Sequence, residues 1–325
     1  MSTITHESRS RTWPQRSNRV QVPTGIAPPL DGLAEEWLAR LQAEHKSIYT
    51  QRLYVGTVAD LANFLANRGM PTDPLGITGE HVREYLNDQF ERGLAAKTVW
   101  SRYTYLRSFF AWLLDENEVT AHPMARMKPP KLGERPPAMV TDDQFAAVLA
   151  ACRGSTWEDK RDEAVIRLLE STGVRRAELA AVLVADLDLA ARIVRVHGKG
   201  DAWRDVRFDT ATQATMYRYR RERAKHRNAA LPQFFLTRMG AMSANSVGEV
   251  VAKRCRVAGL VDGQGRELVH PHMFRHRFAD RWKAAGGSEE GLMAIGGWKN
   301  PEHMKQYGRT NRTARALEEY DRVRE

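Results

Sequence analysis

An arginine and a glutamate in the middle of the chain have the residue types and spacing to hold an anion. The segment STGVRRAELAAV predicts one helix that ends at Gly173 and another that begins at Arg175. An arginine beside the free backbone N–H groups of a helix start can bind a phosphate, and Glu178, three residues on, can fix the arginine side chain. Taken alone, the segment favours a simpler interpretation, a surface arginine with a capping partner.

A lysine lies in a predicted turn further along. The segment HGKGD places Lys199 between Gly198 and Gly200, after a short β-branched stretch. A lysine on such a turn can enter a site and give a proton to a phosphate ester. The GxxxxGK spacing of phosphate-binding loops is absent, and a lysine in a turn is more often a solvated charge.

A third segment, HPHMFRHRF, gathers basic side chains on one face of a predicted helix. His272, Arg275 and His276 are three and four residues apart and therefore share that face. A metal site is the alternative, but HxH at a helix start does not converge on an ion, and neither CxxC nor HExxH accompanies it. A phosphate fits better, because arginine offers it two donors and histidine carries a proton near neutral pH.

The fourth segment is WKNPEHMKQYGRTNR, which contains Trp298 and Tyr307 among basic residues. Both can be ordinary packing residues. A phenol is a weak nucleophile near neutral pH and needs a prepared site, whereas a tryptophan offers one N–H donor on an apolar body. Tyr320 is a rival nucleophile, which we reject because it lies among acidic residues and at the wrong spacing from Trp298.

Together the four segments predict a phosphoryl transfer without metal or cofactor. Fixed cations would stabilise the charge on a five-coordinate phosphate, while a base and an acid would serve the nucleophile and the leaving oxygen. No Ser-His-Asp spacing, carboxylate pair or metal cluster competes. The candidate catalytic residues are Arg175, Lys199, His272, Arg275, Trp298 and Tyr307.

The composition narrows the class of partner. The 325 residues carry a net charge of +10, which favours a polyanion, with nucleic acid first, although many arginine-rich proteins are basic without binding DNA. No apolar run is long enough to span a membrane, and the N-terminus lacks a secretory stretch. Cys152 and Cys255 form no disulfide framework. We expect a cytoplasmic protein without a membrane partner.

These residues must be positioned by two predicted domains. Residues 1–30 are polar and basic and predict a flexible arm. Residues 31–125 show four amphipathic helical stretches, the first capped by Asp31, and almost no strand signal. Residues 126–139 are rich in proline and basic residues and predict an extended linker.

Residues 140–325 predict a second, mostly helical domain, whose first helix Thr141 would cap. Around residues 193–208, β-branched and alternating residues flank the turn GKGDAW and predict a small β-hairpin. The fold class is therefore mainly α. The later predicted helices span residues 211–227, 243–259, 272–285 and 289–296.

At the four segments the chain resembles the tyrosine recombinases of the phage-integrase and Xer superfamily. The matching boxes are TGxRxxEL, GKGxKxRxV, HxLRHxxA and LGH…Y, for which this chain has TGVRRAEL, HGKGDAWRDV, HPHMFRHRFA and GGWKNPEHMKQYGR. The resemblance covers about residues 31–325. Trp298 stands where many members, Xer proteins included, have histidine. Residues 1–30 are too short for the separate arm-binding domain of larger phage integrases.

The resemblance implies a SAM-like helical core-binding domain, a mostly helical catalytic domain with a small antiparallel sheet, and a specific reaction. The residue that matches Tyr307 attacks a scissile DNA phosphate, forms a 3′-phosphotyrosine and releases a 5′-hydroxyl. That hydroxyl, on another strand, then attacks in turn, so that no ATP and no metal are required. The partner implied is double-stranded DNA with a specific recombination site. In the synaptic complex a homo-tetramer holds two duplexes. Before synapsis the protein is a monomer or a dimer.

The resemblance also implies a role for each of the other candidates. Arg175 and Arg275 match the arginines that hold the non-bridging oxygens. Lys199 matches the lysine that protonates the leaving oxygen. His272 matches the histidine that assists proton transfer at the tyrosine, and Trp298 shapes and steadies the pocket.

DNA contacts outside the catalytic residues are predicted on the fourth helix of the first domain. The DNA-binding candidates there are Lys97, Arg102, Tyr103 and Arg107. The alternative is an amphipathic helix that uses its apolar residues for the core, and both can hold on different faces. The basic stretch 218–227 suits phosphate contact and a solvated face equally, and the C-terminal tail is expected to pack on a neighbouring protomer.

Two other functions remain open. A type IB topoisomerase shares this active site, but the chain length and the helical first domain favour a recombinase. A DNA-binding protein without catalysis would lack a catalytic residue, and all six candidates are present.

Overall fold

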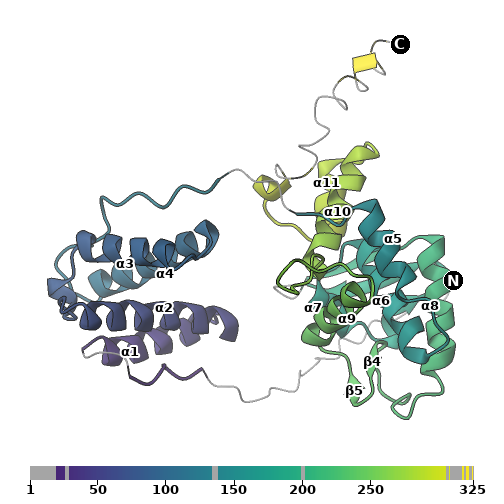
Figure 1. The fold of residues 1–325 in the computed structure, drawn as a ribbon, viewed down its shortest axis with the longest axis horizontal. Helices are drawn as coiled ribbons and strands as arrows, with labels where there is room; N and C mark the ends of the chain where they lie inside the picture. The colour runs from purple at the N-terminus through teal and green to yellow at the C-terminus, as the bar shows by residue number, and fades with distance from the viewer. Residues whose placement is uncertain are drawn as a thin grey trace, which may run out of the picture. The chain divides into compact units, whose positions relative to one another are not determined.

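The computed structural model divides into two compact units, Met1–Glu134 and Arg135–Glu325 (Figure 1). The division falls within the stretch predicted to be a linker. The described residues are 20–25, 29–133, 138–198, 202–304, 307, 317, 320, 321 and 324. Most of the predicted arm and of the C-terminal tail lies outside them. None of the described helices is long and apolar enough to cross a membrane.

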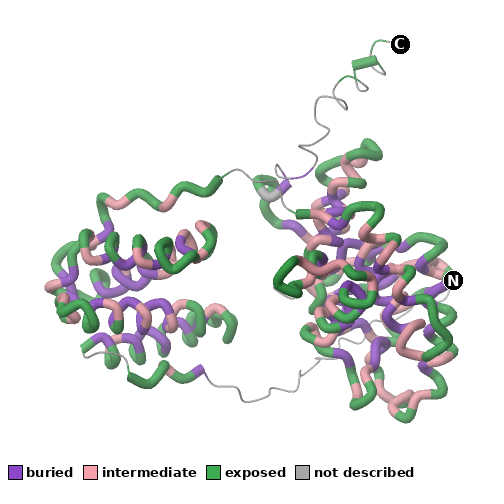
Figure 2. Tube along the Cα trace, viewed as in Figure 1, coloured by how far each residue is buried: buried purple, intermediate pink, exposed green. Residues whose placement is uncertain are grey.

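The first unit is helical, as predicted. Its elements are α1 (Leu30–Ala43), α2 (Ile48–Asn67), the short 3-10 helix η1 (Pro74–Gly76), α3 (Gly79–Glu91) and α4 (Ala96–Asp115). Buried residues line the inward faces of these helices (Figure 2). Trp37 on α1 packs against Phe109 on α4 with 5.0 Å between the ring centroids, so aromatic packing joins the first helix to the last.

One predicted cap is wrong. The helix α1 begins two residues earlier than the sequence suggested, and its N-cap position is Pro29 instead of Asp31. Leu30 is completely buried, and burying it in the helix outweighs the capping preference of Asp31. The Asp31 carboxylate lies in the first turn and accepts a hydrogen bond from the Gly32 backbone at 2.8 Å.

The helix α4 turns two of its four DNA-binding candidates inward. Tyr103 is buried, and its hydroxyl donates to the Met127 carbonyl at 2.7 Å. Arg102 is half-buried and donates to Asp60 and to the Tyr85 hydroxyl, at 2.6 and 2.9 Å. These two side chains therefore make contacts within the first unit.

The second unit is mostly helical with small antiparallel sheets, also as predicted. Its helices are α5 (Asp142–Ala150), α6 (Trp157–Thr172), α7 (Arg176–Ala181), η2 (Val184–Asp186), α8 (Thr210–Arg223), α9 (Ala244–Val257), α10 (Pro271–Ala284), α11 (Glu289–Gly296) and η3 (Pro301–Met304). The helix α6 lies at the centre and packs against α8, α9 and α10. Thr141 caps α5 through the Gln144 backbone, as its sequence predicted.

The predicted hairpin is present and gains a third strand. The strands β1 (Leu187–Asp188), β2 (Ile193–His197) and β3 (Trp203–Arg207) form one antiparallel sheet in that order. Val194 and Val206 face each other in the register and are buried, so this face of the hairpin joins the core. The strands β4 (Leu236–Thr237) and β5 (Gly240–Ala241) form a second, smaller pair.

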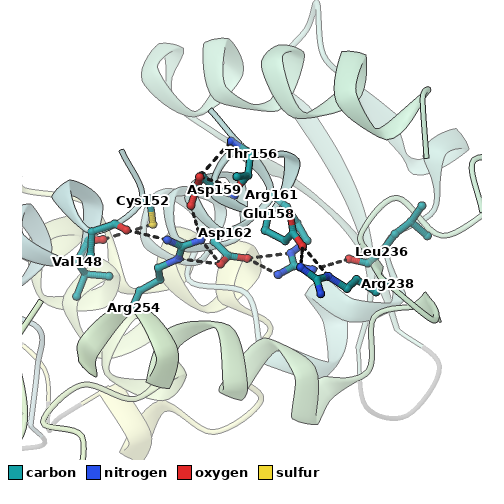
Figure 3. Close-up of polar contacts among 11 residues, drawn as sticks. Val148, Cys152, Thr156, Glu158, Asp159, Arg161, Asp162, Leu236, Arg238 and Arg254 are labelled. Atoms are coloured by element: carbon teal, nitrogen blue, oxygen red, sulfur yellow. Dashed lines mark hydrogen bonds and ion pairs between the residues drawn. The ribbon is translucent and has the colours of Figure 1, made fainter. Parts of the chain in front are cut away.

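A buried charge cluster joins α6 to α9 (Figure 3). The Asp162 carboxylate is completely buried and accepts from Arg161 at 2.8 and 2.6 Å and from Arg254 Nε at 2.7 Å. Arg254 also donates to the Ala151 carbonyl, and Arg161 to that of Leu236. One carboxylate thus fixes both helices relative to the end of α5 and to β4.

Replacing Asp162 with asparagine is expected to lower the free energy of unfolding of the second unit by about 3–5 kcal/mol, because Arg161 would lose its buried counter-charge and Arg254 would keep only its pair with Asp159. Urea unfolding followed by circular dichroism measures the change. The matched control is Asp205→Asn, which breaks the exposed pair with Arg195 and should leave stability unchanged. Equal stability of Asp162→Asn and the wild type would contradict this account of the cluster.

Candidate active site

A buried carboxylate organises the first part of the site. Glu178 on α7 accepts from Arg175 Nη1 at 2.7 Å and from Arg204 on β3, with Nη2 at 2.7 Å. Arg175 Nη2 also donates to the Gly297 carbonyl, and Arg204 Nε donates to that of Ile295. One acidic side chain therefore ties the start of α7, the hairpin and the end of α11 together.

Glu178 also caps α7, because its carboxylate accepts from the Arg175 backbone N–H at 2.8 Å. The simpler interpretation of this segment is thus correct as far as the cap goes, and the arginine side chain is fixed as well. Burial alone would raise the pKa of Glu178, but hydrogen bonds from Arg204 and from the Arg175 backbone lower it below its usual value. The Arg175 side chain remains 37% exposed, so an anion can reach its guanidinium.

Arg275 on α10 is only 1% exposed. Its Nη1 donates to the Gly173 carbonyl at 2.8 Å and its Nη2 to that of Gly296 at 2.7 Å. The guanidinium carbon lies 3.5 Å from the ring centroid of Trp298, a cation–π contact. Burial and the nearby charge of Arg175 lower the pKa of Arg275 to about 9, which still leaves it charged at neutral pH.

Tyr307 is 4% exposed and packs edge-on against Trp298, with 5.7 Å between ring centroids. Its hydroxyl lies 2.9 Å from Nδ1 of His276. The exposed His272, one turn earlier on α10, contacts the His276 ring edge-on at 4.4 Å between centroids. Partial covering of its ring and the charge of Arg275 lower the pKa of His272, whereas burial and His272 lower that of His276 to about 4, so both rings are neutral at neutral pH.

The glycines that end α11 let this packing occur. A Cβ at Gly296 would lie 1.7 Å from the Trp298 ring, so a larger residue would displace the indole from Arg275. Gly297 ends the helix in the left-handed conformation at φ +65°, which glycine adopts without steric cost. The pair of glycines therefore brings Trp298 onto Arg275 directly after a helix end.

The structure brings five of the six candidate catalytic residues into one cluster. These are Arg175, His272, Arg275, Trp298 and Tyr307. Lys199 lies outside the described residues. The residues that flank its turn are paired, since the Gly198 backbone N–H donates to the Ala202 carbonyl at 2.8 Å.

Two residues of the cluster were not among the candidates. Arg204 occupies the position of the arginine in the GKGxKxRxV pattern, so this motif could have identified it. Its contact with Glu178 joins residues far apart in the sequence and could not be predicted from the motif alone. The sequence predicted the helix face on which His276 lies, but not its contact with Tyr307. That contact depends on how the segment after α11 packs onto α10, which no local sequence pattern indicates.

The geometry suits attack on an anionic ester. Tyr307 offers a buried phenol that contacts a neutral imidazole, which can take its proton. Arg175 and Arg275 provide charge beside it, and their held side chains need little reorganisation when negative charge develops. A phosphate diester fits these donors.

Comparison of the sequence with known proteins assigns the chain to a family. Residues 138–313 match the phage integrase family, and residues 33–118 match the SAM-like N-terminal domain of phage integrases. The tyrosine recombinase XerC of Xanthomonas campestris is 30% identical over 264 residues, which cover 80% of this chain and 79% of that protein. XerC of Bacillus pumilus is 28% identical over 237 residues, 71% of this chain and 76% of that protein.

Solved structures share the fold. A lambda integrase dimer bound to a COC′ core site has a TM-score of 0.68 at 15% identity and covers 85% of this chain and 94% of that one. The integrase of the Tn1549 transposon, in complex with a circular intermediate DNA, has a TM-score of 0.67 at 20% identity, covering 89% and 98%. The chain belongs to the phage integrase family and is a tyrosine-type site-specific recombinase.

Replacing Glu178 with glutamine is expected to lower the free energy of unfolding by about 2–4 kcal/mol at pH 7, because the largely buried Arg204 and the partly exposed Arg175 both lose this buried carboxylate. The lowered pKa of Glu178 makes its contribution full above about pH 4.5, the usual value, and lost as the pH falls through the folded-state pKa. The difference between variant and wild type should therefore shrink towards pH 3.

Thermal unfolding at pH 7 and pH 3 measures both parts of this prediction. The control is Glu267→Gln, which pairs with Arg256 near the surface and should change stability little at either pH. A Glu178→Gln defect of the same size at both pH values would show that packing, and not the charge network, holds this part of the site.

Proposed function

We propose that Tyr307 is the nucleophile of this recombinase and that it forms a 3′-phosphotyrosine with one strand of double-stranded DNA at a specific recombination site. The single observation that supports this role most strongly is the 2.9 Å contact of its buried hydroxyl with a neutral imidazole, beside the Arg275–Trp298 pair. The strand with the free 5′-hydroxyl is then exchanged and rejoined, without metal or ATP.

The other candidates take roles around the same phosphate. Arg175 and Arg275 hold the non-bridging oxygens, and Lys199 protonates the leaving 5′-oxygen. His272 assists proton transfer at the tyrosine. Trp298 steadies the pocket by covering Arg275. The hydrogen bonds of Arg175 to Glu178 and to the Gly297 carbonyl, and of Arg275 to two backbone carbonyls, support a site that is arranged before DNA arrives.

We propose a homo-tetramer in the synaptic complex, formed from monomers or dimers. A lambda integrase tetramer bound to a Holliday junction shares the fold of this chain, with a TM-score of 0.65 at 15% identity. The net charge of +10 suits a polyanionic partner. We also propose that the protein acts in the cytoplasm, on the bacterial nucleoid.

Among the four candidates on α4, the exposed Lys97 and Arg107 are the proposed DNA contacts. The Lys97 ammonium lies 4.2 Å from the ring centroid of Trp100, which holds the lysine stem at the surface. Arg107 donates to the Tyr103 hydroxyl at 3.1 Å, so the buried tyrosine supports the arginine and does not itself face DNA.

The double variant Lys97→Ala/Arg107→Ala is expected to weaken DNA binding across sequences and to reduce the slope of log affinity against log salt by about 2, because each phosphate contact contributes about one counterion. Fluorescence anisotropy over a salt series gives the slope. Arg83→Ala removes an exposed arginine that pairs with Glu80 on α3 and serves as control. An unchanged slope in the double variant would exclude these two residues as phosphate contacts.

Tyr307→Phe is expected to abolish covalent protein–DNA complexes, because phenylalanine has no hydroxyl to attack the phosphate. Nicked suicide duplexes from DNA that flanks the gene, incubated without added metal and resolved on a denaturing gel, would show the complex with wild type. Tyr320→Phe changes an exposed tyrosine and should keep the band.

Three other outcomes lead to different conclusions. DNA binding on a native gel without any covalent band would favour a DNA-binding protein without catalysis. Relaxation of supercoiled plasmid without a defined site would favour a type IB topoisomerase. A band that persists in Tyr307→Phe would assign the nucleophile to another residue.

A further inference from the structure

We propose that His276 is the general base that takes the phenolic proton of Tyr307, a role that rests on the proposed function of Tyr307 as nucleophile. Nδ1 of His276 lies 2.9 Å from the Tyr307 hydroxyl, and the two ring centroids are 5.3 Å apart. The role requires that the phenol donates and the imidazole accepts, which places the ring hydrogen on Nε2. In that tautomer the hydroxyl that must lose its proton has an acceptor within hydrogen-bond distance.

The backbone at His276 is fixed on both sides. Its neighbour Arg275 is held by the carbonyls of Gly173 and Gly296. Its other neighbour, Arg277, is buried and donates to the Val140 carbonyl at 3.0 Å, with Glu170 and Asp142 also in reach. Two anchored arginines thus hold the turn of α10 that presents the imidazole, and a fixed base keeps its proton-transfer distance.

The charges around His276 favour the neutral imidazole, which is the form that can act as a base. The titratable and charged groups that act on it are His272 and Arg275 on its own helix and Tyr307 after η3. Together with burial, the two groups on α10 keep the ring neutral at neutral pH. When an anionic phosphate binds beside Arg275, it favours the charged imidazolium and so strengthens the base at the moment of reaction.

In the cleavage step the Tyr307 oxygen forms a bond to phosphorus while the bond from phosphorus to the 5′-oxygen breaks. The phenolic proton passes to Nδ1 of His276, and the leaving oxygen takes a proton from the acid, for which Lys199 is proposed above. On rejoining, a 5′-hydroxyl returns its proton to the group that acted as the acid and its oxygen forms a bond to phosphorus. The bond from phosphorus to the Tyr307 oxygen breaks, and the imidazolium returns its proton to the departing phenolate. His276 therefore serves both cleavage and rejoining, and the exposed His272 acts through its edge-on contact with the His276 ring.

The first experiment compares single-turnover cleavage of a suicide duplex by wild type and His276→Gln. We expect the variant to form the covalent complex about 10²-fold more slowly, the lower part of the usual range for general base catalysis, with unchanged DNA affinity and melting temperature. His226→Gln is the matched control, because His226 belongs to the same unit but contacts Trp157 outside the site. His276→Asn serves as a second variant if glutamine disturbs the fold.

The second experiment separates a base from a packing residue. Tyr307 is replaced by 3,5-difluorotyrosine, whose more acidic phenol loses its proton more readily and therefore needs less help from a base. The defect of His276→Gln should then shrink at least tenfold relative to its defect with tyrosine. A merely structural histidine would give the same defect with either phenol.

These two experiments distinguish a failure of the role of His276 from a failure of the role of Tyr307. Cleavage by His276→Gln within threefold of wild type, or a defect that is the same with both phenols, overturns the role of His276 and leaves Tyr307 as nucleophile. The absence of any covalent complex with wild type, on DNA that it binds, would overturn the proposed function and this role with it.

Discussion

The charge of Glu178 is the constraint on which the rest of the site depends. A buried carboxylate is costly unless charged donors surround it, and this one is surrounded by two arginines from different elements. Because these arginines also donate to the carbonyls of Gly297 and Ile295, satisfying one acid fixes the end of α11. The segment that carries Trp298 and Tyr307 begins at that end.

A second layer of order follows from Arg275. Its buried charge is offset by two backbone carbonyls and the face of an indole, not by a carboxylate. That choice of partners leaves the positive charge uncancelled, which suits a site that must stabilise an anion. The same carbonyls belong to Gly173 and Gly296, so the two helix ends that approach the site both depend on residues that lack a side chain.

The two units contribute differently. The first presents exposed basic side chains on α4 and keeps Arg102 and Tyr103 for its own stability. The second contains every described residue of the candidate active site, and the buried Asp162 cluster holds its central helix to α9 (Figure 3). The described residues of the candidate active site are therefore positioned by contacts within the second unit.

The sequence by itself determined the mainly α fold, and it predicted a two-domain division and the segments that carry the candidate catalytic residues. Those features follow from local signals, such as the periodicity of apolar residues, the glycine at a helix end and the four boxes in order. It placed His272, Arg275 and His276 on one helix face for the same reason. The cap of α1 was misjudged because burial of Leu30 depends on residues far along the chain.

Only the tertiary structure decided which of these side chains meet. Arg204 reaches Glu178, and His276 reaches Tyr307, across separations that no local pattern encodes. The same holds for the inward turn of Tyr103, which a helical pattern alone cannot distinguish from exposure to a groove. The physical reason is common to all three. Local sequence determines the direction of a side chain relative to its own helix, whereas packing determines what lies in that direction.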